Sequence, residues 1–447
     1  MKIYLEFDKV MTRKLILPFF VQLSVLLLSC SPNKVQTKYD HEGVVTQLPY
    51  LWRSSISDGT VGTKLYLGYT IKDNSILCEI KQKSTISDPN WESSIALKSV
   101  KTGKDIWIWN DLFDKELIRT LNDDIVIEND KIWIHDLMAD YCIDARDGKT
   151  IWKTLRTFPS YSEACNIGDQ YFFAANGIQS SLHEKRADSF FRYLINGKGF
   201  IEIGQPLYSD RYKSSNNNYF GSIKNITAFS RDKSDFLVVP FVEQGPATGS
   251  SANYNPIQTF YGLFNITEGV WIYERIPLSE KEEGGIMGIK PIIQGDKVYL
   301  TSAAYVYCFN VLNGEQIWKK KLTNDFSAVL DMILAEDKLL LNLFNAKLYC
   351  VDAQTGKLLW TQKSSGISGD LYHQNGVVYW IPLGNLRAVD LETGKLLWNL
   401  DTIERESVKS NKSEWHGFVT GIPGKNGEKG KIFATSDHYL YCFEAIR

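Results

Sequence analysis

The chain has 447 residues, of which 44% are hydrophobic, 23% charged and 13% aromatic, with a formal net charge of −2. A nearly neutral chain without long basic runs does not bind nucleic acid by neutralising phosphates, so that class of function is excluded. The 12 Trp, 23 Tyr and 22 Phe residues favour strands, and an all-β assembly of this length can form one domain.

The first thirty residues read as an export signal. Arg13 and Lys14 precede the apolar run Leu15–Leu28, which has the length of a signal-peptide core and is too short to span a bilayer. Residues 1–29 are therefore predicted to be a signal peptide. A start at Met11 would remove acidic residues that are unusual in such a leader.

The apolar run ends in LLSC, Leu27–Cys30, which resembles the bacterial lipobox. That resemblance implies cleavage before Cys30 and lipid modification of its thiol, and several acyl chains together hold a protein stably at a membrane. Ser31 resembles the sorting signal for the outer membrane, so we expect a lipid-anchored protein of the cell envelope that faces the periplasm. Residues 30–46 are mostly polar and read as a flexible tether, which leaves 47–447 as one folded domain.

One motif recurs along the rest of the chain. Five glycines are each followed by a tryptophan four residues later: Gly103 and Trp107, Gly148 and Trp152, Gly314 and Trp318, Gly356 and Trp360, Gly394 and Trp398. Two weaker copies place Tyr273 after Gly269 and Ile201 after Gly197. Successive glycines are 38 to 49 residues apart, except for one gap of 72. A period near 45 with β-rich segments predicts a propeller of repeated sheets.

Each copy has the same internal order. An apolar strand such as KLLLNL is followed by a second strand such as LYCVD, then by a turn, and then by a strand that contains the tryptophan. The glycine supplies the positive φ of the turn, and the tryptophan can cover the junction with a neighbouring copy. Four turns carry an acidic or amide side chain that can accept hydrogen bonds from turn amides: Asp144, Asn310, Asp352 and Asp390.

The segment AVDLETGKLLW, Ala388–Trp398, fits the pattern A-x-D-x-x-T-G-x-x-x-W at every position, and CVDAQTGKLLW differs only at Cys350. This pattern resembles the tryptophan-docking repeat of the quinoprotein-type, or PQQ-like, β-propeller family. The resemblance is strong over the last third of the chain and weak across 160–280. It implies four-stranded antiparallel blades that the tryptophans tie together.

The last copy is incomplete. His438–Arg447 contains LYCFEA but ends before the turn glycine, and an open blade edge needs a partner strand. The segment Gln47–Ile56 offers Trp52 at the docking position. We therefore expect eight blades, closed by pairing of this N-terminal strand with the C-terminal blade. Seven blades are the alternative if Gly197 does not mark a blade turn.

Six cysteines follow Cys30, which by parity alone would suggest three disulfides. The same repeat position, six residues before the glycine, holds four of them: Cys142, Cys308, Cys350 and Cys442. Equivalent positions in different blades lie around a ring, beyond the ~7 Å between Cα atoms that a disulfide allows. We expect these four to be buried packing residues. Cys78 and Cys165 are the remaining candidate pair.

The family resemblance brings in an enzyme class, the PQQ-dependent dehydrogenases. It implies for them PQQ, calcium carboxylates, a vicinal Cys-Cys ring and often a haem-c C-x-x-C-H segment. Neither cysteine motif occurs in this chain, and its six histidines have no metal-binding spacing. We therefore expect no catalytic residue, no metal site, and neither PQQ nor calcium. A PQQ-dependent dehydrogenase stays as an alternative.

The gap of 72 residues is the main irregularity of the repeat. Its added length covers 209–225 and 243–256, which are rich in Tyr, Asn, Ser and Gly, the composition of adaptable contact loops. This composition makes Tyr212, Tyr219, Phe220 and Tyr254 candidate contacts for a ligand or partner. The plainer interpretation is a decoration of one blade.

These features favour a non-enzymatic binding or scaffolding lipoprotein, because a rigid ring with variable loops offers large surfaces for protein contacts. The anchor and repeat together resemble the architecture of the BamB-type lipoproteins. That resemblance implies a protein partner in the envelope and a role in outer-membrane protein assembly. A propeller that binds a carbohydrate, such as an envelope glycan, or a small molecule is the second interpretation.

Overall fold

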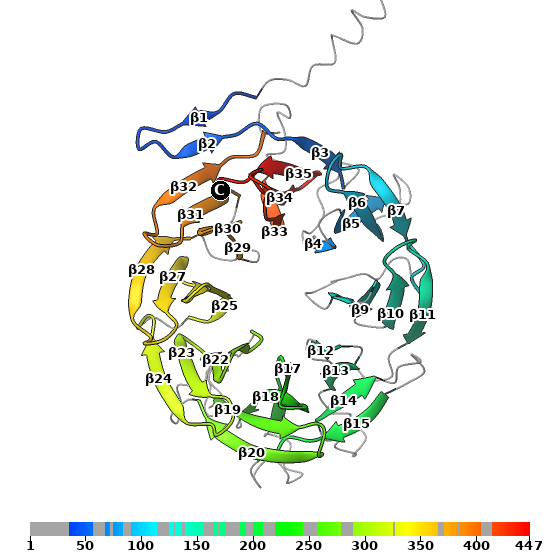
Figure 1. Cartoon of the computed structure of the whole chain (residues 1–447), viewed down its shortest axis with the longest axis vertical. Coiled ribbons are helices and arrows are strands. Elements are labelled where there is room, and N and C mark those ends of the chain that lie inside the picture. Colours follow the sequence, from blue (N-terminus) through cyan, green and yellow to red (C-terminus); the bar gives the residue numbers. More distant parts are fainter. Residues whose placement is uncertain are drawn as a thin grey trace, which may run out of the picture.

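The computed structural model describes residues 35–56, 68–71, 75–83, 91–113, 125–128, 130–135, 139–155, 165–168, 170–175, 188–193, 200–208, 220–244, 257–278, 289–324, 327–364, 371–382, 384–403 and 414–447. Within these residues it contains 35 strands and no helix, grouped in eight sheets. Figure 1 shows the sheets as blades arranged in a ring. The prediction of an all-β propeller is confirmed, with eight blades rather than seven. The described part of the chain contains no helix long and apolar enough to cross a bilayer.

We number the blades in chain order from β4. Blade 1 contains β4 (Gly68–Ile71), β5 (Ser75–Lys83), β6 (Trp91–Ser99) and β7 (Asp105–Trp109), and blade 2 contains β8 (Ile125–Glu128), β9 (Lys131–His135), β10 (Ala139–Asp144) and β11 (Thr150–Leu155). Blade 3 contains β12 (Cys165–Ile167), β13 (Gln170–Ala175), β14 (Ser189–Tyr193) and β15 (Phe200–Gly204). Blade 4 contains β16 (Phe220–Ile223), β17 (Thr227–Arg231), β18 (Ser234–Gln244), β19 (Ile257–Asn265) and β20 (Val270–Pro277). Gly197 lies outside the described residues, but Tyr193 pairs with Phe200 on either side of it, so its repeat does form a blade.

Blade 5 contains β21 (Ile292–Gln294), β22 (Lys297–Ser302), β23 (Tyr305–Asn310) and β24 (Gln316–Lys321), and blade 6 contains β25 (Val329–Ala335), β26 (Lys338–Leu343), β27 (Lys347–Asp352) and β28 (Leu358–Lys363). Blade 7 contains β29 (Tyr372–Gln374), β30 (Val377–Trp380), β31 (Leu386–Asp390) and β32 (Leu396–Leu400). Blade 8 contains β33 (Trp415–Ile422), β34 (Lys431–Ser436) and β35 (Tyr439–Glu444). In blades 1 to 7 the chain begins at the strand nearest the ring axis and ends at the rim strand (Figure 1).

Blade 6 illustrates how the repeat specifies its strands. Its middle strands β26 and β27 are buried along almost their whole length, because neighbouring blades cover both faces, and this explains their continuous apolar runs. The rim strand β28 alternates between partly buried and exposed residues, because only one of its faces contacts the next blade.

The turn before the rim strand follows from three residues. In blade 6, Asp352 Oδ1 accepts hydrogen bonds from the backbone N–H and the hydroxyl of Thr355, both at 2.7 Å. The N–H of Gly356 donates to the carbonyl of Asp352 at 2.9 Å, and Gly356 has φ of +70°. Blade 7 repeats the arrangement with Asp390 and Thr393. We call the face of the ring that carries these turns the turn face.

The ring closes as expected from the incomplete last copy. β3 (Trp52–Ser55) pairs antiparallel with β35 and becomes the rim strand of blade 8, with Trp52 opposite Cys442. The N-terminal strand therefore completes the C-terminal blade, and the predicted closure is confirmed. Figure 1 shows β3 beside β35 at this blade.

The segment before β3 differs from the tether expected over 30–46. Two strands, β1 (Lys38–Tyr39) and β2 (Val45–Gln47), form a hairpin on the outside of blade 7, where β2 pairs parallel with β32. Val44 is buried, and Val45 packs against the core between blades 7 and 8. Burial of these two valines stabilises the hairpin, so the second half of the expected tether is part of the fold.

Blades 1 and 4 have longer middle hairpins than the others. The middle strands pair through nine residues in each of them, against six in blade 6. The added pairs lie at the ends away from the turn face. In blade 4 two short strands, β16 and β17, share the edge of β18. Part of the irregular sequence between Gly197 and Gly269 is therefore strand.

The cysteines behave as the repeat register predicts. All six described cysteines are free, and five are buried while Cys165 is partly exposed. Burial raises the pKa of the Cys350 and Cys442 thiols to about 12. Cys78 and Cys165 do not form a disulfide.

Candidate functional site

The repeat tryptophans join each blade to the next. Their indole N–H groups donate to a backbone carbonyl in the turn of the following blade: Trp52 to Val100 at 2.9 Å, Trp107 to Ala145 at 3.1 Å, Trp318 to Ala353 at 3.2 Å and Trp360 to Leu391 at 2.9 Å. The rings cover the turn glycines Gly103, Gly148, Gly356 and Gly394. These predicted repeat residues therefore build the ring.

Four of the eight junctions depart from this pattern, and blade 3 carries Ile201 at the docking position. Tyr273 replaces the indole in blade 4, and its hydroxyl donates to the carbonyl of Val311 at 2.9 Å beside Gly314. Trp152 packs edge-to-face on Trp133 of its own blade at 5.4 Å between ring centroids, and Trp133 stacks on Tyr171 of blade 3 at 5.5 Å. Trp398 packs against Phe443 at 6.3 Å, next to the β1–β2 hairpin.

The predicted contact residues of the irregular region cannot be placed as a site. Tyr212, Tyr219 and Tyr254 lie outside the described residues, as does Cys30, and of Phe220 only the backbone, in β16, is described. The strands that flank these segments are described. Gln244 at the end of β18 pairs with Ile257 at the start of β19, on the side of the ring away from the turn face.

An ionic cluster lies among these strand ends. Glu243, which is 1% exposed, forms a two-pronged ion pair with Arg275, whose second nitrogen lies 2.6 Å from Glu243 Oε2. The guanidinium also stacks on Phe260, 3.9 Å from the ring centroid, and donates to the carbonyl of Leu207. Arg275 therefore ties the connection between blades 3 and 4 to the rim of blade 4.

Tyr208 extends this cluster into blade 3. Its hydroxyl donates to Asp188 Oδ2 at 2.5 Å, and its ring packs edge-to-face on Phe241. Burial, followed by the charge of Asp188, raises the pKa of Tyr208 well above its usual value. Burial lowers the pKa of the neighbouring Lys224. The cluster holds together the strands at the base of the irregular region.

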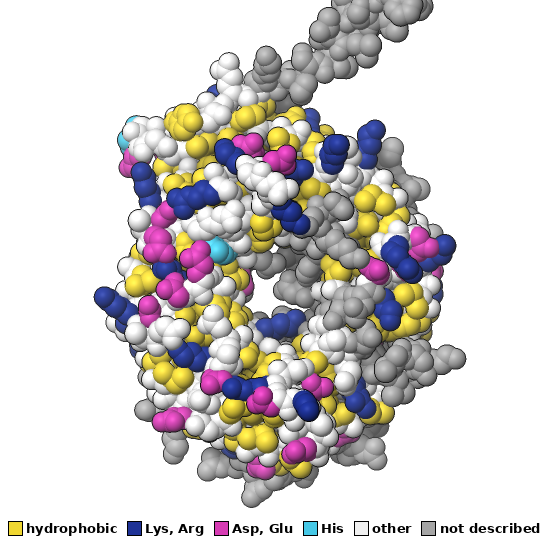
Figure 2. All heavy atoms as spheres, viewed as in Figure 1, with side chains coloured by type: hydrophobic (Ala, Val, Ile, Leu, Met, Phe, Trp, Pro, Cys, Tyr) yellow, Lys and Arg dark blue, Asp and Glu magenta, His cyan; other side chains and the backbone are white. Residues whose placement is uncertain are grey.

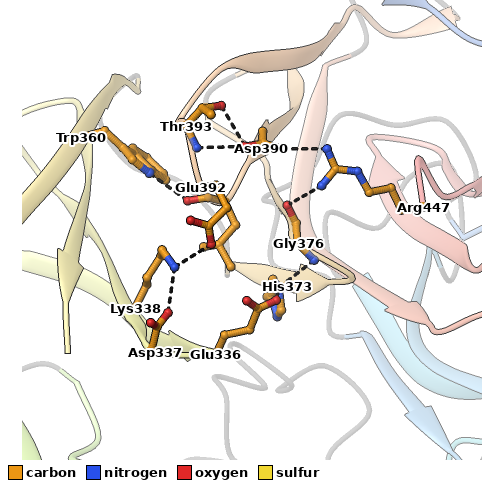
Figure 3. Close-up of polar contacts among 11 residues, drawn as sticks. Glu336, Asp337, Lys338, Trp360, His373, Gly376, Asp390, Glu392, Thr393 and Arg447 are labelled. Atoms are coloured by element: carbon orange, nitrogen blue, oxygen red, sulfur yellow. Dashed lines mark hydrogen bonds and ion pairs between the residues drawn. The ribbon is translucent and has the colours of Figure 1, made fainter. Parts of the chain in front are cut away.

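A second polar cluster joins blades 6, 7 and 8 on the turn face (Figure 3). Lys338 of blade 6 contacts its neighbour Asp337 and, across the junction, Glu392 of blade 7, and each carboxylate oxygen lies 2.7 Å from Nζ. The hydrogen bonds that Lys338 donates to both carboxylates raise its pKa. The lysine therefore links two blades by an ion pair beside the docked indole of Trp360.

Arg447 continues this cluster from blade 8. Its guanidinium lies 2.7 Å from Asp390 Oδ2 and donates to the carbonyl of Gly376. Burial alone would raise the pKa of Asp390, but the bonds from Arg447 and Thr393 lower it below its usual value. His373 accepts a hydrogen bond from Gly376 N–H at 3.2 Å and lies 3.6 Å from Glu336. These contacts join blade 8 to blade 7 and blade 7 to blade 6.

On the face of the ring that Figure 2 shows, charges of both signs are mixed. Figure 2 shows acidic and basic side chains next to one another around a central opening. In the described residues, no three His, Cys, Asp or Glu side chains come together as metal ligands.

Exposed aliphatic side chains recur on the rim of the ring. The residue immediately before the docking aromatic is an exposed aliphatic side chain in six blades: Leu51, Ile106, Ile151, Ile272, Ile317 and Leu359. The equivalent Leu397 of blade 7 is partly buried in the core cluster that Val45 also joins. Sequence reasoning passed over these side chains, although strand alternation places the neighbour of an inward-facing Trp on the outer face.

The fold and its junctions define the class of the protein: an eight-bladed β-propeller whose blades are joined by docked tryptophans. A family model described as "Outer membrane protein assembly factor BamB" matches residues 302–417. The match covers about a quarter of the chain and, with the repeat that runs through the ring, supports the resemblance to the PQQ-like β-propeller family. No curated protein matches the sequence.

Solved structures show the same fold at low identity. A europium-containing methanol dehydrogenase has a TM-score of 0.55 at 10% identity, over 86% of this chain and 84% of that one. Sqt1 of Saccharomyces cerevisiae has 0.54 at 8%, over 87% and 100%. BamB from Moraxella catarrhalis has 0.47 at 13%, over 86% and 99%. The methanol dehydrogenase and Sqt1 share this fold under different names, so the fold alone does not choose a function.

Proposed function

We propose that the chain is a non-catalytic protein-binding module of the bacterial cell envelope, held at the outer membrane by a lipid on Cys30 and facing the periplasm. The observation that carries this proposal is the row of exposed aliphatic side chains on the rim, one in each of six blades. Exposed apolar side chains that recur on one surface favour contact with another protein. The turn face supports it by contrast, since its charges pair with one another.

The match to the BamB family model supports a role in outer-membrane protein assembly for this chain. The partner would then be an envelope protein, bound by a ring that stays rigid because its junctions are closed by hydrogen bonds and packed rings. Rigidity suits a scaffold, because little conformational entropy is lost when a partner binds.

The test is cross-linking in intact membranes with the full chain carrying a C-terminal tag, followed by purification and mass spectrometry. We expect at least one envelope protein to be enriched over a tag-only control. If none is enriched, the proposal fails. The anchor has its own test: Cys30→Ala should release the protein from membranes into the soluble fraction, and retention of that variant would contradict the lipid anchor.

The methanol dehydrogenase likeness makes the enzyme alternative testable. Purified protein given PQQ and calcium should not oxidise alcohols or sugars in a dye-linked assay. Turnover there would replace the binding proposal by the enzyme class. Binding to a glycan panel, lost in Tyr219→Ala and Tyr254→Ala, would favour the carbohydrate interpretation instead.

A further inference from the structure

The rim strand of blade 1 differs from the other rim strands. β7 reads DIWIW, so the docking Trp107 has an aliphatic neighbour on each side. In six other blades the residue after the docking aromatic is polar or charged: Arg53, Lys153, Glu274, Lys319, Thr361 and Asn399. Charged residues on edge strands, lysine above all, prevent pairing with another chain. At this position β7 has Ile108 and lacks that protection.

The exposure of β7 matches its sequence. Ile106 is 52% exposed and Ile108 53%, and both point to the same side because they are two residues apart in a strand. Trp107 faces the other way, with its indole on Gly148 and Ala145 of blade 2. In the described residues β7 pairs with β6 alone, so its outer edge is open. Apolar side chains flank an unpaired strand edge here.

The chain itself contains an example of what such an edge binds. In blade 7, β2 adds to the rim strand β32 in parallel, with Val45 opposite Trp398. Trp398 and Trp107 are equivalent in register, because the partner strand has its irregularity immediately after Ala388 in one blade and Leu97 in the other. The occupant of β32 is a short extended segment with adjacent valines, Val44 and Val45.

We propose that β7 is the docking edge for a partner, which adds an extended segment rich in β-branched residues as a fifth strand of blade 1. This inference rests on the proposed protein-binding function and names its surface. Main-chain hydrogen bonds to the open edge supply affinity, and alternate side chains of the added strand pack against Ile106 and Ile108. By analogy with β2, the added strand runs parallel to β7.

The structure supplies a matched pair of variants. Ile108→Lys installs at β7 the residue that blades 2 and 5 already carry at this position, Lys153 and Lys319, so the variant should fold. Thr361→Lys makes the same exposed position of blade 6 basic and leaves β7 unchanged. Thermal unfolding of both variants checks that the ring is intact.

The probe is a phage-displayed library of ten-residue peptides, selected on purified wild-type protein. We expect recovered peptides with alternating β-branched residues, about tenfold weaker binding to Ile108→Lys, and unchanged binding to Thr361→Lys. Hydrogen–deuterium exchange should show protection of residues 105–109 on peptide binding, which an apolar contact without strand pairing would not produce. Peptides that bind both variants like the wild type, or no protection of β7, would overturn the proposal.

Three further outcomes separate this proposal from its alternatives. A dimer of the wild type that Ile108→Lys abolishes, measured by sedimentation, would assign the edge to a second copy and overturn the proposal. If membrane cross-linking enriches a partner that Ile108→Lys retains in full, the β7 proposal fails while the protein-binding function stands. If the wild type enriches no partner, the protein-binding function itself fails.

Discussion

The docking of an indole on a turn glycine predicts that equivalent glycines differ in their tolerance of a methyl group. Gly394 has φ of +68°, and a Cβ there would lie 2.6 Å from Cδ2 of Trp360. Gly269 has φ of +71° in the equivalent turn of blade 4, but a Cβ there would have nothing within 4 Å. Alanine is strained in both places, while only Gly394→Ala displaces a docked ring.

The cost of each change follows from these contacts. The left-handed backbone costs an alanine about 1–2 kcal/mol, which is the whole expected effect of Gly269→Ala. Gly394→Ala also breaks the bond from Trp360 to Leu391, worth about 1 kcal/mol, and disturbs the packing of the indole by about 1–2 kcal/mol. We therefore expect a loss of about 3–5 kcal/mol for Gly394→Ala.

The assay is urea unfolding followed by tryptophan fluorescence and circular dichroism, which gives the free energy of unfolding of each variant. In a Trp360→Ala background, Gly394→Ala should cost no more than Gly269→Ala does in the wild type, because the clash is gone. Equal losses for Gly394→Ala and Gly269→Ala in the wild-type background would refute the docking argument.

Three other predictions concern buried groups. Because burial raises the pKa of the Cys350 and Cys442 thiols to about 12, both should resist iodoacetamide at pH 8 in the folded protein and react after unfolding; native labelling would contradict their packing. Arg275→Ala leaves the buried carboxylate of Glu243 without this partner and should cost about 3 kcal/mol in urea unfolding, whereas a loss below 1 kcal/mol would show that Glu243 is solvated. Burial lowers the pKa of His373 below 6.5, so the unfolded chain takes up this proton first and stability should fall as the pH drops below about 6.5; His373→Gln should reduce that slope, and an unchanged slope would assign it elsewhere.

The positions of the blades could be predicted because the repeat encodes them locally. Asp352, Thr355 and Gly356 specify a turn by themselves, and the register of Gly and Trp then counts the units. The closing strand followed from one missing turn, since an open edge requires a partner. These features depend on short stretches of sequence, which is why they are readable without coordinates.

The β1–β2 hairpin was missed because its stability comes from distant residues. Its strands have two and three residues, too few for a periodic pattern, and Val45 packs on a core made by blades 7 and 8. A local signal was present, however. Asp40 accepts hydrogen bonds from the N–H groups of Glu42 and Val44, and Gly43 has a positive φ, as in the repeat turns.

The ion pairs between blades also escaped prediction. Lys338 and Glu392 are 54 residues apart, and Arg447 and Asp390 are 57 apart, so only the assembled ring brings them together. The rim aliphatics were readable in principle. The motif K-L-L-W places a leucine beside the docking tryptophan, and strand alternation gives it to the opposite, exposed face.

The claim that the rim is the contact surface for a partner can be tested by position-specific photo-cross-linking. A photoreactive amino acid replaces one residue at a time in the full chain in membranes, at the rim positions Ile108 and Ile151 and at the turn-face positions Asn313 and Gln354. The account predicts adducts with another protein from rim positions, with Ile108 strongest, and none from the turn face. Adducts from the turn face alone, or from no position, would contradict it.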